Sequence, residues 1–210
     1  MLKYQQYSLL PEFETNTYLV WDDDSKEAML IDPSAPSDKL RDFINKHNLT
    51  LKFIVNTHGH ADHIGGNVFF KANLKTPVAI HVSDADMLPD PKLNLSAYIE
   101  INLALPSADM FLKDGDTYEL GKHIITVIHT PGHTQGCICL YCDNLLFSGD
   151  TLFQHDIGRT DLPSGSYEKI INSVKTRLFT LPGETIVLPG HGASSTIHDE
   201  VLHNPYLKGK

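Results

Sequence analysis

The run His58–His63 places three histidines and one aspartate within six residues, directly after the apolar stretch Leu51–Val55. The apolar stretch predicts a buried strand, so the polar run lies on the loop at the C-terminal end of that strand. Neutral imidazole is the commonest transition-metal ligand in proteins, and carboxylate oxygen joins it at zinc, iron and manganese sites. The first two histidines point the same way on extended backbone and can share one ion, while the last two ligand residues follow a turn and can reach a second. The run therefore predicts a metal site beside a buried strand, with the number of ions left open.

The same local pattern occurs three more times: an apolar strand, a turn rich in small residues, and then a side chain of metal-ligand type. Glycine and proline let the backbone bend sharply at such turns and approach a bound ion closely. Together with the first cluster, these residues make five imidazoles and two carboxylates, a set that satisfies two divalent ions when one carboxylate bridges them. The three additional residues are His133 in Thr130–Thr134, Asp150 at the end of Leu145–Asp150, and His191 in Leu188–Gly192.

The order and spacing of these seven residues resemble the metallo-β-lactamase superfamily and, within it, the glyoxalase II-like (hydroxyacylglutathione hydrolase-like) enzymes. The resemblance extends over nearly the whole chain, from Thr15–Tyr18 to Asn204–Leu207. Gly149–Phe153, with Ile157–Pro163 after it, resembles the small single-domain branch of that group. The resemblance implies an α+β fold, a four-layer αββα sandwich of two mixed sheets with helices outside.

Two divalent metal ions are the cofactors that the resemblance implies. Zinc is the first expectation, with iron or manganese as alternatives, because imidazole and carboxylate sites accept all three. Asp62 and Asp150 are expected to act in catalysis as ligands that orient a metal-bound hydroxide for attack on a polarised carbonyl. The resemblance assigns His58, His60 and His133 to one metal, assigns Asp62, His63 and His191 to the other, and makes Asp150 the bridge between them.

The favoured reaction is hydrolysis of a small-molecule thioester such as an acyl-glutathione. A thiolate with a pKa of about 8.5 departs without a proton donor. An amide nitrogen generally needs a general acid, and no further motif in this chain points to one. The family resemblance implies the same choice.

Arg159 is the candidate for binding the substrate. It lies nine residues beyond Asp150, where the resemblance implies a Lys or Arg that meets a carboxylate of glutathione. A planar guanidinium suits that task because it forms two hydrogen bonds with a carboxylate. The other interpretation is a structural salt bridge with Asp161 or Asp156. Larger relatives add a C-terminal helical domain with further basic residues, whereas nineteen residues follow His191 here, so the thiol carrier stays open.

Other activities on the same scaffold define the alternatives. Persulfide dioxygenases resemble the chain through the same ligands and a stretch like Gly158–Asp161, but they use one iron and oxygen, and they are the second candidate. β-Lactamases generally lack an aspartate bridge at the position of Asp150, and diiron electron-transfer relatives place Glu at the position of His60. Nucleases of this fold share the bridge, but an acidic chain without an RNA-binding arm argues against them. A non-enzymatic metal-binding protein is the alternative from another class.

The composition limits the partners of the chain. Its 210 residues fit one domain over 1–210, and 41% hydrophobic with 20% charged residues is ordinary for a globular protein. A net charge of −9, without a local cluster of Lys and Arg, argues against a nucleic-acid partner, because phosphate binding needs a basic surface. We see no apolar signal core and no apolar run of about 18 residues, so we expect a cytoplasmic protein without a membrane partner. The oligomeric state stays open.

All three cysteines lie in Gly136–Cys142. Strand alternation puts Cys137 and Cys139 on one face and Cys142 on the other, and no further cysteine completes a four-ligand zinc site. We therefore expect buried thiols, and their odd count fits a reducing compartment.

The apolar periodicity predicts two halves, each with strands first and helices after. The region Ser83–Lys113 is expected to form short helices in a loop beside the active-site mouth, with its role open. Seven further histidines are expected to lack ligand partners, although one of them, His155, lies close enough to Asp150 in sequence to flank the site. The other six are His47, His81, His123, His129, His198 and His203. The predicted strands are Tyr4–Leu10, Thr17–Asp22, Ala28–Ile31, Leu51–Val55, Pro77–His81, Thr117–Leu120, His123–Ile128, Gly136–Tyr141, Asn144–Ser148 and Thr185–Leu188. The predicted helices are Ser37–His47, Asn67–Leu74, Ser166–Phe179 and Ile197–His203.

Overall fold

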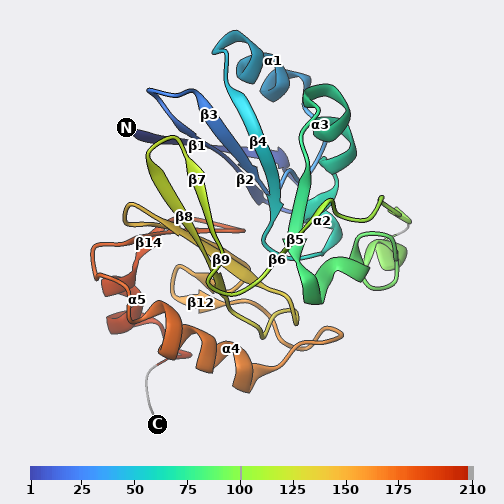
Figure 1. Ribbon diagram of the computed structural model, residues 1–210. Coiled ribbons are helices and arrows are strands. Elements are labelled where there is room, and N and C mark those ends of the chain that lie inside the picture. Colours follow the sequence, from blue (N-terminus) through green and yellow to red (C-terminus); the bar gives the residue numbers. More distant parts are fainter. Residues whose placement is uncertain (100, 208–210) are drawn as a thin grey trace.

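Two six-stranded sheets pack face to face, and helices cover the outer face of each sheet (Figure 1). The computed structural model describes residues 1–99 and 101–207. Helices α1 and α3 lie outside one sheet, and α4 and α5 lie outside the other, which is the four-layer αββα arrangement that the resemblance predicted. Within the described residues, none of the helices is both long and apolar enough to cross a membrane.

The first sheet starts as an antiparallel meander, β1 to β3, and continues with parallel pairs from β3 to β6. Parallel neighbours need a crossover connection, and helices α1 (Asp38–Lys46) and α3 (Asn67–Leu74) supply two of them. The Ser37 hydroxyl accepts a hydrogen bond from the Leu40 N–H and so caps α1. In sheet order the strands are β1 (Leu2–Leu10), β2 (Thr15–Asp22), β3 (Glu27–Ile31), β4 (Thr50–Asn56), β5 (Val78–His81) and β6 (Met110–Leu112).

The second sheet is antiparallel except where β10 pairs with β13 in parallel. Its outer face is covered by α4 (Tyr167–Ser173), by the π-helical segment η3 (Val174–Leu178) that continues it, and by α5 (Ile197–His203). A small hairpin of β11 (Leu152–Phe153) and β12 (Asp156–Ile157) follows β10. In sheet order the strands are β14 (Ser195–Thr196), β13 (Ile186–Pro189), β10 (Leu145–Gly149), β9 (Ile138–Cys142), β8 (His123–His129) and β7 (Thr117–Leu120).

Apolar side chains from both sheets fill the space between them. The ring of Phe147 lies edge-on to that of Tyr18, with 5.3 Å between the ring centroids. On its outer face, each sheet packs against the elements that cover it through one further core. Cys142 belongs to the core between the sheets and Cys139 to the core under the second pair of helices, so the prediction that they face opposite ways is confirmed. Cys137 is buried too, and among the described residues all three thiols are free.

The C-terminal ends of β4, β8, β10 and β13 meet at one edge of the sandwich, and the loops after them carry the predicted ligands. The predicted strands and helices are present, but several elements of two to four residues were not predicted: α2 (Ala61–Ile64), β6, the β11–β12 hairpin and β14. They are too short to show a hydrophobic period. The short helices expected within Ser83–Lys113 are the 3₁₀ helices η1 (Val82–Met87) and η2 (Ser96–Ile99).

Candidate metal centre

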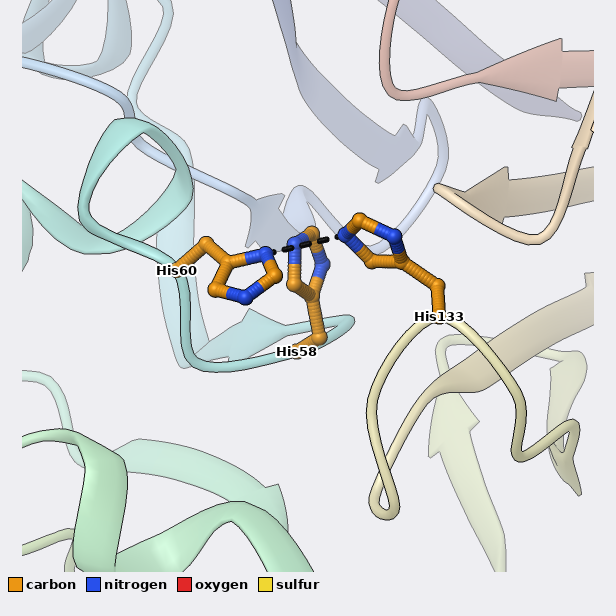
Figure 2. Close-up of side chains that lie close together, drawn as sticks. All are labelled: His58, His60 and His133. Atoms are coloured by element: carbon orange, nitrogen blue, oxygen red, sulfur yellow. Dashed lines mark hydrogen bonds between the residues drawn. The ribbon is translucent and has the colours of Figure 1, made fainter. Parts of the chain in front are cut away.

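Three imidazoles from two loops form the first group of donor atoms. His58 and His60 follow β4, and His133 follows β8. One ligand atom of each residue lies within 4.8 Å of those of the other two. Figure 2 shows the rings of His60 and His133 facing each other beside His58, with His60 Nδ1 and His133 Nε2 2.9 Å apart. The buried Nε2 of His58 has no hydrogen-bond partner within the described chain, so its lone pair is free for a cation.

The second group joins Asp62 and His63, on the short helix α2, to His191 in the loop after β13. Asp62 Oδ2 lies 3.4 Å from Nε2 of each histidine, and the two Nε2 atoms are 3.2 Å apart. The one-turn helix explains why residues 62 and 63 diverge from the first two histidines of the run. The backbone turns between His60 and Asp62, so Asp62 and His63 face His191 in the loop after β13, whereas His60 faces His133 in the loop after β8.

Asp150, at the end of β10, lies between the two groups. Its Oδ1 is 3.4 Å from His63 Nε2, and its Oδ2 is 3.5 Å from His133 Nε2 and 3.4 Å from His191 Nε2. Oδ1 is also buried without a hydrogen-bond partner among the described residues. Gly190 makes room for this carboxylate, because a Cβ there would lie 2.2 Å from Asp150 Oδ1. The structure thus brings all seven predicted residues together, with one carboxylate facing both groups.

Backbone carbonyls hold the outer nitrogens of two imidazoles. His133 Nδ1–H donates to the Arg159 carbonyl oxygen at 2.8 Å, and His191 Nδ1–H donates to the Phe13 carbonyl oxygen at 2.9 Å. Because a carbonyl only accepts, Nδ1 carries a proton in both rings and Nε2 is the nitrogen left for a cation. Metal-ligating histidines are oriented in this way in proteins. The donor set therefore fits divalent cations.

The histidine pKa values shift in opposite directions in the two groups of donors. Burial, reinforced by neighbouring imidazoles, lowers the pKa of His58 well below its usual value and that of His60 to about 3, so both lone pairs are free at neutral pH. Burial opposes a charge on His63 and His191 as well, but the adjacent carboxylates outweigh it. They raise the pKa of His63 above its usual range and that of His191 to about 10. The side of the centre that carries the carboxylates thus favours positive charge, as a cation site must.

Asp32 and Asp84 are two buried carboxylates that the sequence analysis missed. Asp32 lies directly after β3; one carboxylate oxygen lies 3.0 Å from His63 Nδ1, and the carboxylate accepts hydrogen bonds from the Thr57 N–H at 2.7 Å and the Thr57 hydroxyl at 2.6 Å. It therefore orients His63 and fixes the start of the ligand loop. The available signal was its position: like the ligands, it follows a strand of the sandwich.

Asp84, in η1, links the two histidine loops of the first group. Its Oδ2 accepts from the Gly59 N–H at 3.2 Å and from the Thr134 hydroxyl at 2.6 Å, and its Oδ1 accepts from the Gly136 N–H at 2.7 Å. Burial raises the pKa of Asp84, while these three donors act in the opposite direction. Gly59 lies between His58 and His60, so Asp84 sets the distance between the loops.

A pocket of about 280 Å³ opens over the centre. Arg159 lines it and also pairs with Asp161, donating from Nε at 2.8 Å and from Nη2 at 2.7 Å to the two carboxylate oxygens. Both side chains are largely exposed, at 62% and 68%. Asp161, and not Asp156, is thus the salt-bridge partner of Arg159. The lining is completed by Phe13, His60, Ala61, Asp62, Asn94, Leu95, Ile99, His133, Asp150, Leu162 and His191.

Three of the histidines expected to lack partners have them, so that expectation is wrong for His123, His155 and His203. His123 lies beside Cys142 and Asp143, and the other two share Asp199. The partners of His123 and His155 are 20 and 44 residues away, so no local spacing indicated them, whereas Asp199 lies four residues before His203 on the same helix. His81 and His129 form a stacked pair, with 4.1 Å between ring centroids.

Comparison with known proteins identifies the class. A family model described as the metallo-beta-lactamase superfamily matches residues 10–191. Hydroxyacylglutathione hydrolase GloC of Haemophilus influenzae is 35% identical over 206 residues, which cover 94% of this chain and 95% of the relative. The crystal structure of BLEG-1 B3 metallo-beta-lactamase has a TM-score of 0.93 and 36% identity, and the match covers 99% of this chain and 100% of that one. TTHA1623 in a di-iron-bound form has a TM-score of 0.82 and 33% identity, with coverage of 97% and 100%.

The chain therefore belongs to the metallo-β-lactamase superfamily. The predicted resemblance and the predicted fold are both confirmed. Membership of this family, together with the histidine and aspartate groups, supports a metal-dependent hydrolase.

Asp150→Ala is expected to remove metal from both groups of donors and to abolish hydrolysis, because this carboxylate faces both. Elemental analysis of the purified variant, with circular dichroism to check folding, measures the loss. Asp156→Ala, which removes an exposed carboxylate from the neighbouring hairpin, is the matched control and should keep its full metal content. Full metal content in folded Asp150→Ala would contradict a shared carboxylate.

Asp84→Ala is expected to lower the free energy of unfolding by about 2 kcal/mol or more, because it leaves the buried N–H groups of Gly59 and Gly136 without an acceptor at roughly 1–3 kcal/mol each. The Thr134 hydroxyl keeps Cys137 Sγ as an acceptor at 3.0 Å. Metal content should fall as well, since the spacing of the two histidine loops is lost. Urea unfolding measures the first effect and elemental analysis the second. Asp86→Ala, an exposed substitution in the same short helix, should change stability by less than about 0.5 kcal/mol. Equal stability of the two variants would refute the role given to Asp84.

Proposed function

We propose that this protein is a binuclear metal-dependent hydrolase of small-molecule thioesters, with acyl-glutathione as the representative substrate. The position of Asp150 carries the proposal. Its carboxylate oxygens lie 3.4 Å from His63 Nε2 and 3.5 Å from His133 Nε2, one histidine from each group. A carboxylate that faces two separate sets of donors suits two ions better than one.

The proposed ligands divide as the geometry groups them. Two divalent ions bound there would lower the pKa of a shared water and polarise a substrate carbonyl. The protein's own part is to position the reactants: Asp62 and Asp150 line the pocket, so their carboxylates accept hydrogen bonds from the attacking water and orient it. The Thr15 hydroxyl donates to Asp62 Oδ2 at 3.2 Å and fixes that carboxylate. One ion would be held by His58, His60 and His133, the other by Asp62, His63 and His191, with Asp150 shared.

The leaving group favours a thioester. Among the described residues that line the pocket, Arg159 is the one titratable side chain outside the donor set, and its guanidinium does not release a proton at neutral pH. Asn94 is occupied too, because its side-chain amide donates to the Met87 and Leu103 carbonyl oxygens. An amine leaving group would need a proton that this lining does not supply, whereas a thiolate leaves without one.

Two of the relatives support the proposal from outside the chain. The 35% identical protein of Haemophilus influenzae is named a hydroxyacylglutathione hydrolase, which is a thioester hydrolase by name. The structure of TTHA1623 is described in a di-iron-bound form, so a neighbour with 33% identity holds two metal ions. Iron is therefore a candidate metal beside zinc and manganese.

A β-lactam is the second substrate class that a specific observation favours. BLEG-1, with a TM-score of 0.93 over essentially the whole chain, is described as a B3 metallo-beta-lactamase. Ring strain makes the β-lactam amide easier to open than an ordinary amide, so such a substrate places less demand on a proton donor. A chromogenic cephalosporin assayed beside acyl-glutathiones, at equal enzyme concentration, ranks the two substrate classes.

Thioester cleavage is expected to proceed at the same rate with and without oxygen, and to survive replacement of the native metal by zinc. Zinc has no redox chemistry but is a competent Lewis acid, so it supports hydrolysis and not oxygenation. Anaerobic and aerobic assays of the zinc-reconstituted protein measure this. A persulfide dioxygenase would instead need iron and consume oxygen with glutathione persulfide. Oxygen uptake with that compound, and no thioester turnover in any metal form, would overturn the proposal.

Arg159→Ala is expected to raise KM for glutathione thioesters with little change in kcat, because it removes binding that the ground state and transition state share. The exposed ion pair contributes about 0–1 kcal/mol, so the variant should fold normally. Asp161→Ala is the matched variant: it frees the guanidinium, and KM should stay unchanged or fall. Arg159→Lys should lie between, because an ammonium lacks the planar fork. Unchanged kinetics in all three would remove Arg159 from the substrate site.

A further inference from the structure

Two histidines and one aspartate meet on the surface, outside the residues that line the pocket. His155 Nε2 lies 2.7 Å from Asp199 Oδ2, and His203 Nδ1 lies 2.8 Å from Asp199 Oδ1. One ligand atom of each residue lies within 4.8 Å of those of the other two, and the two rings are 5.8 Å apart between centroids. The side chains are 45%, 35% and 57% exposed in chain order, so an ion from solvent reaches them without any opening of the fold.

Contacts that do not involve the imidazole hold His155 in place. It lies in the turn of the β11–β12 hairpin with φ +57, and its backbone N–H donates to the Glu200 carboxylate at 3.0 and 3.2 Å. Glu200 is fully buried and also accepts from the Asn204 side-chain amide at 2.8 Å. That same amide donates to the Asp156 carbonyl oxygen at 3.0 Å. The hairpin is thus anchored on α5, with the imidazole presented beside the helix.

The other two donors are spaced by the helix itself. Asp199 and His203 are four residues apart on α5, so their side chains lie on the same face, one turn apart. The Thr196 hydroxyl caps this helix by accepting from the Asp199 N–H at 3.1 Å, which fixes its first turn. Three donors from two elements are therefore set in place before any ion binds.

We propose that His155, Asp199 and His203 form a second metal site, on the surface, for a divalent late first-row ion such as zinc. Two imidazole nitrogens and one carboxylate oxygen are a ligand set that zinc accepts, and the exposed side leaves a coordination position for water. No sulfur donor takes part, so the site does not depend on thiol redox state. An ion here joins the β11–β12 hairpin to α5.

The β11–β12 hairpin connects the surface site to the candidate metal centre. β11 begins two residues after Asp150, and the ring of Phe153 lies edge-on to that of His191, with 6.1 Å between centroids. An ion at the surface site restrains the far end of the same hairpin. Its measurable effects are the occupancy of the site and the protection of the hairpin backbone, both of which can be read without an activity assay.

The test is equilibrium dialysis of the purified full-length chain against buffers of increasing free zinc, followed by elemental analysis. At saturating zinc the wild type should bind one more equivalent per chain than either His203→Gln or Asp199→Asn. The comparison is a difference between proteins, so it does not depend on how many ions the candidate centre holds. Amide hydrogen exchange should slow with zinc in residues 152–157 and in the last turn of α5 of the wild type, and in neither of the two cluster variants.

His198→Gln is the control, because it removes an exposed histidine from the same helix outside the cluster and should keep the extra equivalent. All the substituted side chains are at least partly exposed, and thermal unfolding checks that each variant is folded. Equal zinc content in the wild type and both cluster variants would overturn the proposal, and Asp199 would then serve as a hydrogen-bond acceptor only. Loss of the same equivalent in His198→Gln would overturn it too, as adventitious binding by surface histidines.

Discussion

The structure depends on keeping two carboxylates and five imidazoles together in a largely buried place. Isolated charges are costly to bury, so such a cluster is stable only where opposite charges and hydrogen bonds compensate one another. Here the donors come from the ends of strands in both sheets, and the packing of the sandwich determines their distances. Asp150 shows how these effects oppose each other: burial opposes its charge, but neighbouring imidazoles keep its pKa below the usual range. Bound cations satisfy the same requirement, which is why a metal-dependent activity suits this edge of the fold.

Residues that touch no substrate maintain that geometry. The carboxylates of Asp32 and Asp84 accept hydrogen bonds from backbone N–H groups and hydroxyls of the ligand loops, and each residue is 1% exposed. Gly190 contributes by having no side chain, since a Cβ would occupy the space of the Asp150 carboxylate. The loops are therefore fixed by hydrogen bonds and by close packing. Asp84 joins the loop after β4 in one sheet to the loop after β8 in the other, so the spacing of the first group depends on both sheets.

The sequence predicted the parts of the site whose signal is local. The run His58–His63 was found from its spacing, and the strands before it and before Asp150 from their apolar composition. That these residues lie together was implied by the family resemblance, because periodicity gives no distance between strands. Asp84 was missed since its three donors come from loops 25 and about 50 residues away, and a lone aspartate in a short helix carries no pattern. His155 was misjudged for the same reason: its partner, Asp199, is 44 residues away.

The substrate is decided by parts of the pocket that the seven donors do not control. His58 and His63 are fully buried, so neither side chain contacts a substrate in the pocket. Outside the donors, the pocket is lined by loop residues such as Phe13, Leu95 and Leu162, together with Arg159, whose side chain is largely exposed. Loops tolerate substitution better than packed strands. Relatives named as a hydroxyacylglutathione hydrolase and as a metallo-beta-lactamase therefore both resemble this chain over nearly its whole length. Under the proposed function, a substrate carboxylate would compete with Asp161 for the Arg159 guanidinium.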